Sequence, residues 1–298
     1  MQLNEYQTLA ARTDRRPEKT EEGLAIPMLG IAGEIGALLA EYKRQIRDGV
    51  VPVNFKQHLR EELGDILWYT ANLALKLDLD LEDVAAANLQ KTADRWLEER
   101  TSPEFFDSDY PVAEQLPRQF EVYFGYADAE GRSKVVVTDG RGAQIGNPLS
   151  DNAFEGDGYR FHDAYHYTFA AMLGWSPVTR RNFKRKRKSN KAVDEVEDGG
   201  RGWVIEEGIA ALSFAYAMEN DCFAGTDHVD ESLLKAVRTL TATVEVKLRS
   251  SREWASAIVT ASRLWRQLNE NDGGGLSGDL ERRTIEFLPA QKAPALAT

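Results

Sequence analysis

Cysteine is the residue type that this sequence most nearly lacks. Cys222 is the only one in 298 residues, so an intramolecular disulfide is excluded and the composition suits a reducing cytosol. We find no run of about 20 apolar residues, the length that a membrane span needs. The first 16 residues are polar and charged, which is not typical of a signal peptide. The sequence therefore predicts a cytoplasmic protein without membrane association.

Positive charge is also in short supply. Lysine and arginine number 37 against 48 aspartate and glutamate residues, which leaves a net charge of −11. This balance disfavours a general nucleic-acid binder, although it leaves room for a local basic patch. With 42% hydrophobic and 29% charged residues, the composition is that of an ordinary globular protein. The length favours two domains.

The most informative stretch is a predicted helix whose apolar stripe is interrupted by acidic residues. Glu62 and Asp65 are three residues apart, so their side chains leave the helix on the same side. Two such carboxylates repel each other unless a cation lies between them. Mg²⁺ prefers oxygen ligands and retains waters that a phosphate can replace. A solvated acidic helix face is the alternative interpretation. The apolar stripe consists of Leu59, Leu63, Ile66, Leu67, Leu73 and Ala74.

Two further predicted helices carry complementary groups. Residues 29–43 are small and apolar around Glu34, so a neighbouring helix can approach closely, and a carboxylate desolvated in this way needs a partner. Residues 81–100 carry Asn88, Lys91 and Arg95 on one face. Carboxylates on two helices and basic side chains on a third are what binding a Mg²⁺-polyphosphate requires.

These segments together resemble a known family. Three stretches follow the order and spacing of the MazG-like all-α nucleoside triphosphate pyrophosphohydrolases. They are Gly33-Glu34-Ile35-Gly36, residues 62–69 (ELGDILWY) and residues 88–95 (NLQKTADR). The pattern of that family is E-x-x-E, then E-x-x-D, then a helix with N-x-x-K and an arginine. The resemblance covers roughly residues 1–100.

The resemblance implies an enzyme that hydrolyses a nucleoside triphosphate to a monophosphate and pyrophosphate, as in house-cleaning of the nucleotide pool. It implies Mg²⁺, with Mn²⁺ as a substitute, and an all-α bundle whose active site is completed in a homo-oligomer, a dimer or tetramer. Tyr6 and Gln7 resemble positions near the nucleotide pocket, although a docking helix explains them equally well. The implied catalytic residues are Glu34, Glu61, Glu62 and Asp65, of which Glu34, Glu62 and Asp65 are metal ligands and Glu61 a possible base. The implied phosphate- or nucleotide-binding residues are Lys43, Asn88, Lys91, Arg95 and Trp68.

The sequence departs from the family pattern at one ligand. The second glutamate of E-x-x-E falls on Ala37, and the nearest substitute, Glu41, lies about 10 Å from Glu34 along a helix axis. Whether one or two metals bind is therefore open. The alternative function is a catalytically weakened nucleotide-sensing module that is coupled to a C-terminal domain.

The remaining chain predicts a mainly α protein with a small β element. Strands are expected at 120–126 and 134–138, and helices at 159–174, 201–220, 230–248 and 251–270. We accordingly predict a pyrophosphohydrolase domain at 1–104, an antiparallel hairpin connector at 105–156, a helical domain at 157–288 and a disordered tail at 289–298. The C-terminal part resembles the extra domain that follows some MazG-like domains.

Three features of this C-terminal part indicate possible sites. His162 and His166 are four residues apart on one helix, a spacing that suits either a metal or satisfied core histidines. The basic run 180–191, with Arg185 and Arg187, suits nucleic acid or phosphate, unless the acids at 194–198 neutralise it internally. Glu206 and Glu207 are interpreted as acids at the positive end of a helix.

Overall fold

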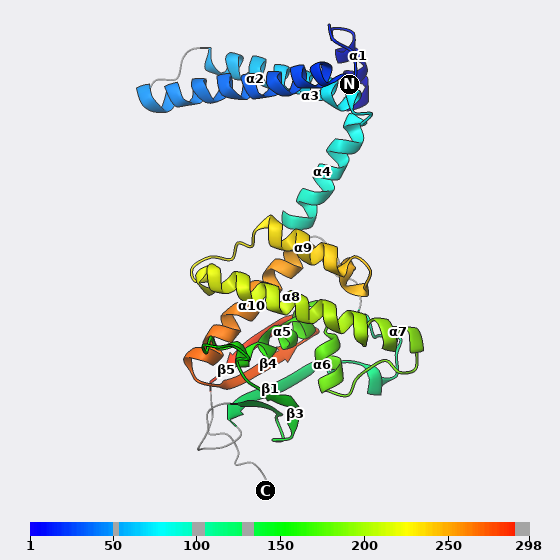
Figure 1. Ribbon diagram of the computed structural model, residues 1–298, viewed down its shortest axis with the longest axis vertical. Coiled ribbons are helices and arrows are strands. Elements are labelled where there is room, and N and C mark those ends of the chain that lie inside the picture. The colour runs from blue at the N-terminus through cyan, green and yellow to red at the C-terminus, as the bar shows by residue number, and fades with distance from the viewer. Residues whose placement is uncertain (50–53, 97–104, 127–133, 290–298) are drawn as a thin grey trace. The chain divides into compact units, whose positions relative to one another are not determined.

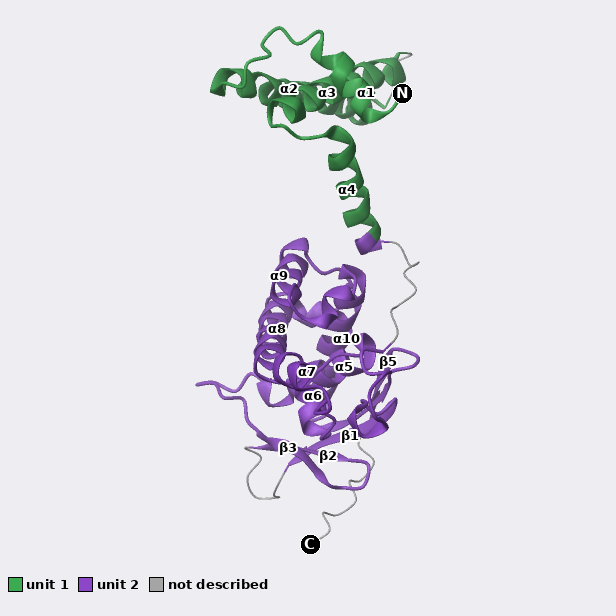
Figure 2. Ribbon diagram, turned by 90° about the vertical axis from the view of Figure 1, so that its right-hand side faces the viewer, with its two compact units in different colours: residues 1–93 green, residues 94–298 purple. Residues whose placement is uncertain are grey.

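The computed structural model describes residues 1–49, 54–96, 105–126 and 134–289. The chain divides into two compact units, unit 1 at Met1–Ala93 and unit 2 at Asp94–Thr298 (Figure 2). The tail predicted to be disordered lies outside the described residues from 290 onwards. Each unit is a separate folded body with its own core.

Unit 1 is helical, as the sequence predicts. Its second helix is longer than expected, because Thr20 caps it by accepting a hydrogen bond from Gly23 and the left-handed Gly49 ends it. Asp80 caps the fourth helix through the backbone N–H groups of Glu82 and Asp83. The helices are α1 (Leu3–Ala11), α2 (Glu21–Asp48), α3 (Phe55–Lys76) and α4 (Leu81–Trp96), which runs on into the first residues of unit 2 (Figure 1).

The core of unit 1 is thin. Helices α2 and α3 approach closely at Gly30, where a Cβ atom would lie 2.4 Å from the Tyr69 ring. Among the described residues, the buried apolar side chains of its core cluster are few and mostly alanines, so this cluster removes little apolar surface from water on its own. They are Ala10, Ala71, Ala74 and Leu81, with Leu3, Tyr6 and Trp68 packed against them.

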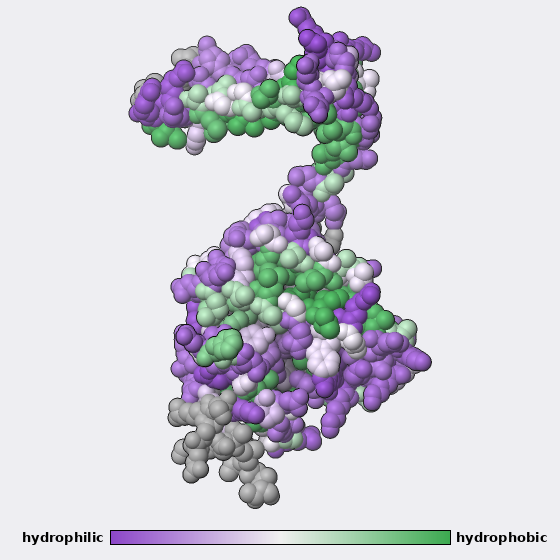
Figure 3. Space-filling model, in the orientation of Figure 1, coloured by the Kyte–Doolittle hydropathy of each residue, from purple (hydrophilic) through white to green (hydrophobic). Residues whose placement is uncertain are grey.

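Large apolar side chains remain exposed on unit 1. Leu29 is 71% exposed, Leu39 57% and Leu89 69%, and a hydrophobic band follows the visible face of this unit in Figure 3. The stripe predicted on α3 is likewise only partly buried, since Leu63 is 56% exposed. Such a surface is typical of a helix face that another molecule covers.

The prediction that no segment reaches the length of a membrane span needs correction. Residues Glu21–Arg47 of α2 are long and apolar enough to cross a membrane, by length and composition only. Leucines, isoleucines and alanines raise the mean hydropathy of this helix, and glycines separate its large apolar residues.

Unit 2 is built on a five-stranded antiparallel sheet of order β3-β2-β1-β4-β5. The predicted hairpin does not form a connector of its own, because β1 also pairs with β4 from the far end of the chain, with Val122 opposite Leu276. The glycine-rich stretch 273–275 leads into β4, which begins at Gly274. The strands are β1 (Gln119–Tyr126), β2 (Val135–Asp139), β3 (Gln144–Leu149), β4 (Gly274–Asp279) and β5 (Thr284–Leu288).

The helices of unit 2 surround α5, which is buried along nearly its whole length and packs against α10, α8 and the sheet (Figure 1). Trp175 and Trp254 lie in this core. The four helices predicted from periodicity are present, and α6 and α7 are additional. They are α5 (Asp163–Leu173), α6 (Pro177–Asn182), α7 (Lys191–Val196), α8 (Gly200–Glu219), α9 (Glu231–Thr241) and α10 (Ser251–Glu270), with 3₁₀ turns at Val112–Glu114, Tyr159–Phe161, Asp221–Phe223 and Glu245–Leu248.

Candidate active site

An acidic cluster lies where α2 and α3 face each other. Glu34 from α2 and Glu62 and Asp65 from α3 each bring a carboxylate oxygen within 4.8 Å of the others. A hydrogen bond with Glu62, followed by burial and the charges of Glu62 and Asp65, raises the pKa of Glu34. A proton shared between two carboxylates relieves the same repulsion that a cation would relieve. The all-oxygen donor set therefore fits Mg²⁺ or Mn²⁺.

The departure at Ala37 leaves this cluster with three carboxylates. Ala37 offers no oxygen, and Glu41 is not part of the cluster. The Glu41 carboxylate instead forms an ion pair with Arg44, in which Arg44 Nη1 lies 3.3 Å from Glu41 Oε1. The geometry favours a reduced ligand set over a displaced one.

Helix α1 approaches the cluster through Tyr6. Burial and the negative charge of Asp65 raise the pKa of the Tyr6 hydroxyl. Gln7 is structural, because its side chain donates to the Leu79 carbonyl and accepts from the Leu81 N–H at 2.9 and 3.0 Å.

Two other predicted residues lie outside the acidic cluster. Trp68 donates from Nε1 to the Thr13 hydroxyl at 2.8 Å and packs against the small core, so the structure gives it the role of a core residue. Glu61 is exposed and accepts a hydrogen bond from Gln57 at 2.8 Å.

The predicted basic residues differ in their surroundings. Lys43, Asn88 and Lys91 are exposed on their helices. Arg95 belongs to unit 2, where Nη1 lies 2.9 Å from the Glu231 carboxylate and the guanidinium lies 5.0 Å from the centroid of the Trp96 ring. A phosphate that contacts Arg95 would have to compete with Glu231.

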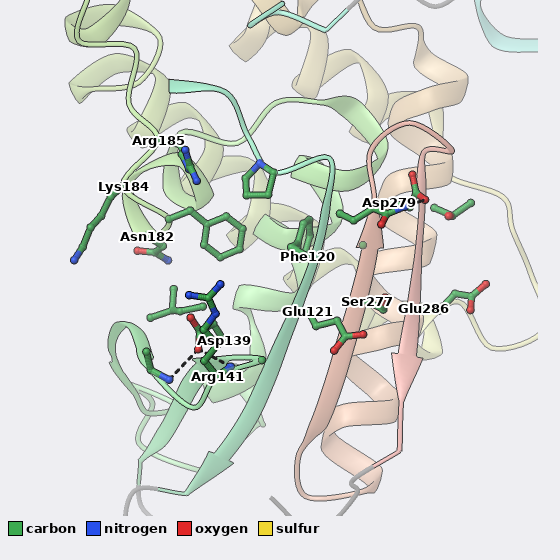
Figure 4. Close-up of a pocket in the computed structure, with 18 of the residues that line it drawn as sticks. Phe120, Glu121, Asp139, Arg141, Asn182, Lys184, Arg185, Ser277, Asp279 and Glu286 are labelled. Atoms are coloured by element: carbon green, nitrogen blue, oxygen red, sulfur yellow. Dashed lines mark hydrogen bonds between the residues drawn. The ribbon is translucent and has the colours of Figure 1, made fainter. Parts of the chain in front are cut away.

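Part of the basic run of unit 2 forms ion pairs and hydrogen bonds within the protein. Arg187 is buried against Asp198 and Glu245, with Nη2–oxygen distances of 2.6 and 2.7 Å. Arg185 donates to the Val112 carbonyl at 3.1 Å. Together with Lys184, it lines a polar cavity of about 940 Å³, whose wall also carries acidic side chains (Figure 4). This environment supports the interpretation that acids neutralise much of the run.

His162, the residue before α5, forms a second cluster with His166 of α5 and Glu207 of α8. Ring nitrogens of His162 and His166 and a carboxylate oxygen of Glu207 lie within 4.8 Å of one another. The interpretation of Glu206 and Glu207 as acids at a helix start does not hold, because α8 begins at Gly200. Sequence reasoning missed their role, since the contact joins residues 40 positions apart.

Comparisons with known proteins agree with this division of the chain. The family model of the MazG nucleotide pyrophosphohydrolase domain matches residues 28–97, and that of the MazG C-terminal domain matches residues 101–291. The "Gene 37 protein" of Mycobacterium phage L5 is 36% identical over 101 residues, which cover 32% of this chain and 89% of that protein. No solved structure gives a significant match.

Proposed function

Because the chain belongs to the MazG family, with a MazG nucleotide pyrophosphohydrolase domain followed by a MazG C-terminal domain, we propose that unit 1 hydrolyses a nucleoside triphosphate to the monophosphate and pyrophosphate. The observation that carries this proposal is the convergence of Glu34, Glu62 and Asp65 from two helices. Members of the family typically use a divalent metal, and this donor set suits one.

In this proposal the three carboxylates of the acidic cluster hold Mg²⁺. When bound, the ion neutralises charge on the triphosphate and lowers the pKa of an attacking water. Glu61, one turn before Asp65 and free of the cluster, is the proposed acceptor of the proton from that water. Because metal ligands must be deprotonated, the raised pKa of Glu34 should weaken metal binding at low pH.

The exposed basic groups of unit 1 are the proposed phosphate contacts. Lys43 and Lys91 place cations on α2 and α4, and Asn88 adds a hydrogen-bond donor one turn before Lys91. Charge-assisted hydrogen bonds from such groups stabilise negative charge that develops on the pyrophosphate leaving group.

We further propose that a second copy of the chain covers the apolar face of unit 1. The thin core and the exposure of Leu29, Leu39 and Leu89 support this arrangement. A lipid environment for α2 is the less favourable alternative, because Glu34 stands at the midpoint of Glu21–Arg47 with two more carboxylates beside it. Carboxylates at the centre of a bilayer are strongly disfavoured. Light scattering of the purified chain should give a multiple of 33.4 kDa.

The enzymatic proposal is tested by pyrophosphate release with Mg²⁺ against a nucleotide panel that includes dUTP, dCTP and damaged bases. Glu62→Gln and Asp65→Asn should each lower turnover by at least about 100-fold, because each removes an ionic ligand of a metal that supplies several kcal/mol of stabilisation. Glu82→Gln, an exposed acid at the start of α4, is the matched control. Turnover within threefold of wild type in both ligand variants would contradict the assignment.

The second candidate is a nucleotide-sensing module, which the missing oxygen at Ala37 favours. This candidate predicts that nucleotide and Mg²⁺ bind to the wild-type chain without pyrophosphate release from any member of the panel. Calorimetry on the same samples separates the two functions, because binding without turnover supports only the sensor.

A further inference from the structure

The histidine pair of unit 2 is oriented by neighbouring hydrogen bonds. The Nδ1 atom of His162 lies 2.8 Å from the Tyr159 carbonyl, and Nδ1 of His166 lies 2.9 Å from the Glu206 carboxylate. Each acceptor draws the ring proton to Nδ1 and leaves a lone pair on Nε2. Metal-ligating histidines in proteins are held in this way, by a carboxylate or a backbone carbonyl on the nitrogen that does not bind the metal.

The Glu206 carboxylate is held by other hydrogen bonds besides the one with His166. Its side chain is fully buried in α8, and it accepts hydrogen bonds from the Ser176 hydroxyl and the Val178 N–H at 2.5 and 2.8 Å. These hydrogen bonds hold the Glu206 carboxylate in place as the acceptor for His166.

Glu207 on the next position of α8 is oriented in a similar manner. Its Oε1 accepts a hydrogen bond from the Trp203 indole at 2.8 Å. The other oxygen, Oε2, lies 3.5 Å from Nε2 of His166. In a tetrahedral site with metal–ligand distances of about 2.0–2.1 Å, neighbouring ligand atoms lie about 3.3–3.4 Å apart, so this spacing fits a shared ion.

The Nε2 atom of His166 is an independent observation that points to a ligand at this site. The side chain is 1% exposed, and within the described part of the chain Nε2 has no hydrogen-bond partner. A buried polar atom left without a partner is costly and calls for an explanation such as an ion. The His166 side chain also belongs to the cluster with His162 and Glu207.

We propose that unit 2 binds a divalent transition metal through His162 Nε2, His166 Nε2 and Glu207 Oε2. Imidazole and carboxylate ligands together suit Zn²⁺ better than Mg²⁺. Three protein ligands leave a fourth coordination position for water or an anionic ligand, as in catalytic zinc sites. The Glu207 side chain is 38% exposed, so that position is reached from the surface. The Asp163 carboxylate, 3.4 Å from Nε2 of His162, lies beside it.

A bound proton is the alternative occupant. Burial opposes the charged form of His166, but the charge and hydrogen bond of Glu206, with Glu207, outweigh burial and raise the pKa of the imidazole. In that state an imidazolium joins two carboxylates without any metal. The two states differ in a measurable way, because only the metal state loads one Zn²⁺ per chain.

The test uses the full chain, which is freed of metal by chelation and then titrated with Zn²⁺ in excess Mg²⁺. The Mg²⁺ competes with Zn²⁺ for the carboxylates of the acidic cluster in unit 1. Calorimetry and elemental analysis should give one Zn²⁺ per chain. Glu207→Gln and His162→Gln should each weaken binding by about 100-fold or more, since losing even a residue that orients a ligand costs roughly 10–100-fold. Circular dichroism checks that each variant folds.

Two controls locate the bound ion. Glu219→Gln changes an exposed acid of α8 and should leave Zn²⁺ binding unchanged. Glu62→Gln should also retain it, so the outcome is independent of the activity proposed for unit 1. Zn²⁺ binding that is absent from the wild type, or that survives unchanged in both folded ligand variants, would overturn the proposal.

Discussion

Arg187 offers the sharpest test of how unit 2 uses its basic run. The side chain is 1% exposed, and all of its N–H groups find acceptors. Asp198 accepts hydrogen bonds from Nε and Nη2, Glu245 accepts from Nη1 and Nη2, and the Phe106 carbonyl accepts from Nη1. Replacing Arg187 by methionine keeps the length of the stem but leaves Asp198, which is fully buried, without its main cation.

Breaking a buried ion pair by removing one partner destabilises a protein by about 3–5 kcal/mol. For a urea dependence of about 2 kcal/mol per molar, the midpoint of unfolding should fall by about 2 M. Urea titration followed by tryptophan fluorescence suits this measurement, because Trp175 and Trp254 are buried in the core of unit 2. The full chain is used, and the transition of unit 2 is the one compared.

Lys188→Met is the matched control, because Lys188 follows Arg187 in the run and is exposed. It should change the free energy of unfolding by no more than about 0.5 kcal/mol. Equal and small effects of both substitutions would refute the structural role of Arg187. A variant Arg187→Met that folds normally but loses affinity for nucleic acid would instead favour a binding role for the run.

Two predictions concern the acidic cluster of unit 1. Ala37→Glu restores the acid one turn from Glu34 and should lower the Mg²⁺ concentration for half-maximal activity by about tenfold, because the number of ligand charges sets affinity. Glu41→Gln should leave activity unchanged, since Glu41 pairs with Arg44. A loss of activity in this second variant would show that Glu41 reaches the metal. The raised pKa of Glu34 means that the folded state holds this proton more tightly than the unfolded one, so its stabilising contribution is present at low pH and is lost as the pH rises through the folded pKa. The melting temperature of the metal-free chain should therefore fall over that range relative to Glu34→Gln, and Mg²⁺ should reverse the fall; parallel pH profiles would contradict this.

The helices of this protein could be predicted because their causes are local. Apolar periodicity, the cap at Asp80 and the acids three residues apart on α3 are all visible within a few turns of sequence. The carboxylate of Glu34 was also predictable, since a charged residue among glycines and alanines indicates a close helix neighbour. The structure supplies that neighbour in α3.

Strand β4 could not be predicted because its glycines are required by side chains from elsewhere in the chain. A Cβ atom at Gly275 would lie 2.9 Å from the Tyr123 ring, and one at Gly278 would lie 2.4 Å from the Phe120 ring. The aromatic rings of β1 thus lie across β4, and only glycine leaves room for them. Within the sequence alone the same glycines favour a loop.

The two units differ in how they satisfy their charged and apolar groups, and this difference indicates where ligands are needed. Unit 2 pairs Arg180 with Asp107 and Arg187 with Asp198 over 73 and 11 residues of sequence, and it buries a large set of aromatic side chains in one core. Unit 1 leaves three carboxylates facing one another and large apolar side chains in water. Repelling carboxylates are stabilised by a cation, and an apolar helix face is stabilised by a complementary surface. A metal and a second copy of the chain are therefore what we propose for unit 1, and in unit 2 the buried Nε2 of His166 is the atom at which the same reasoning favours an ion.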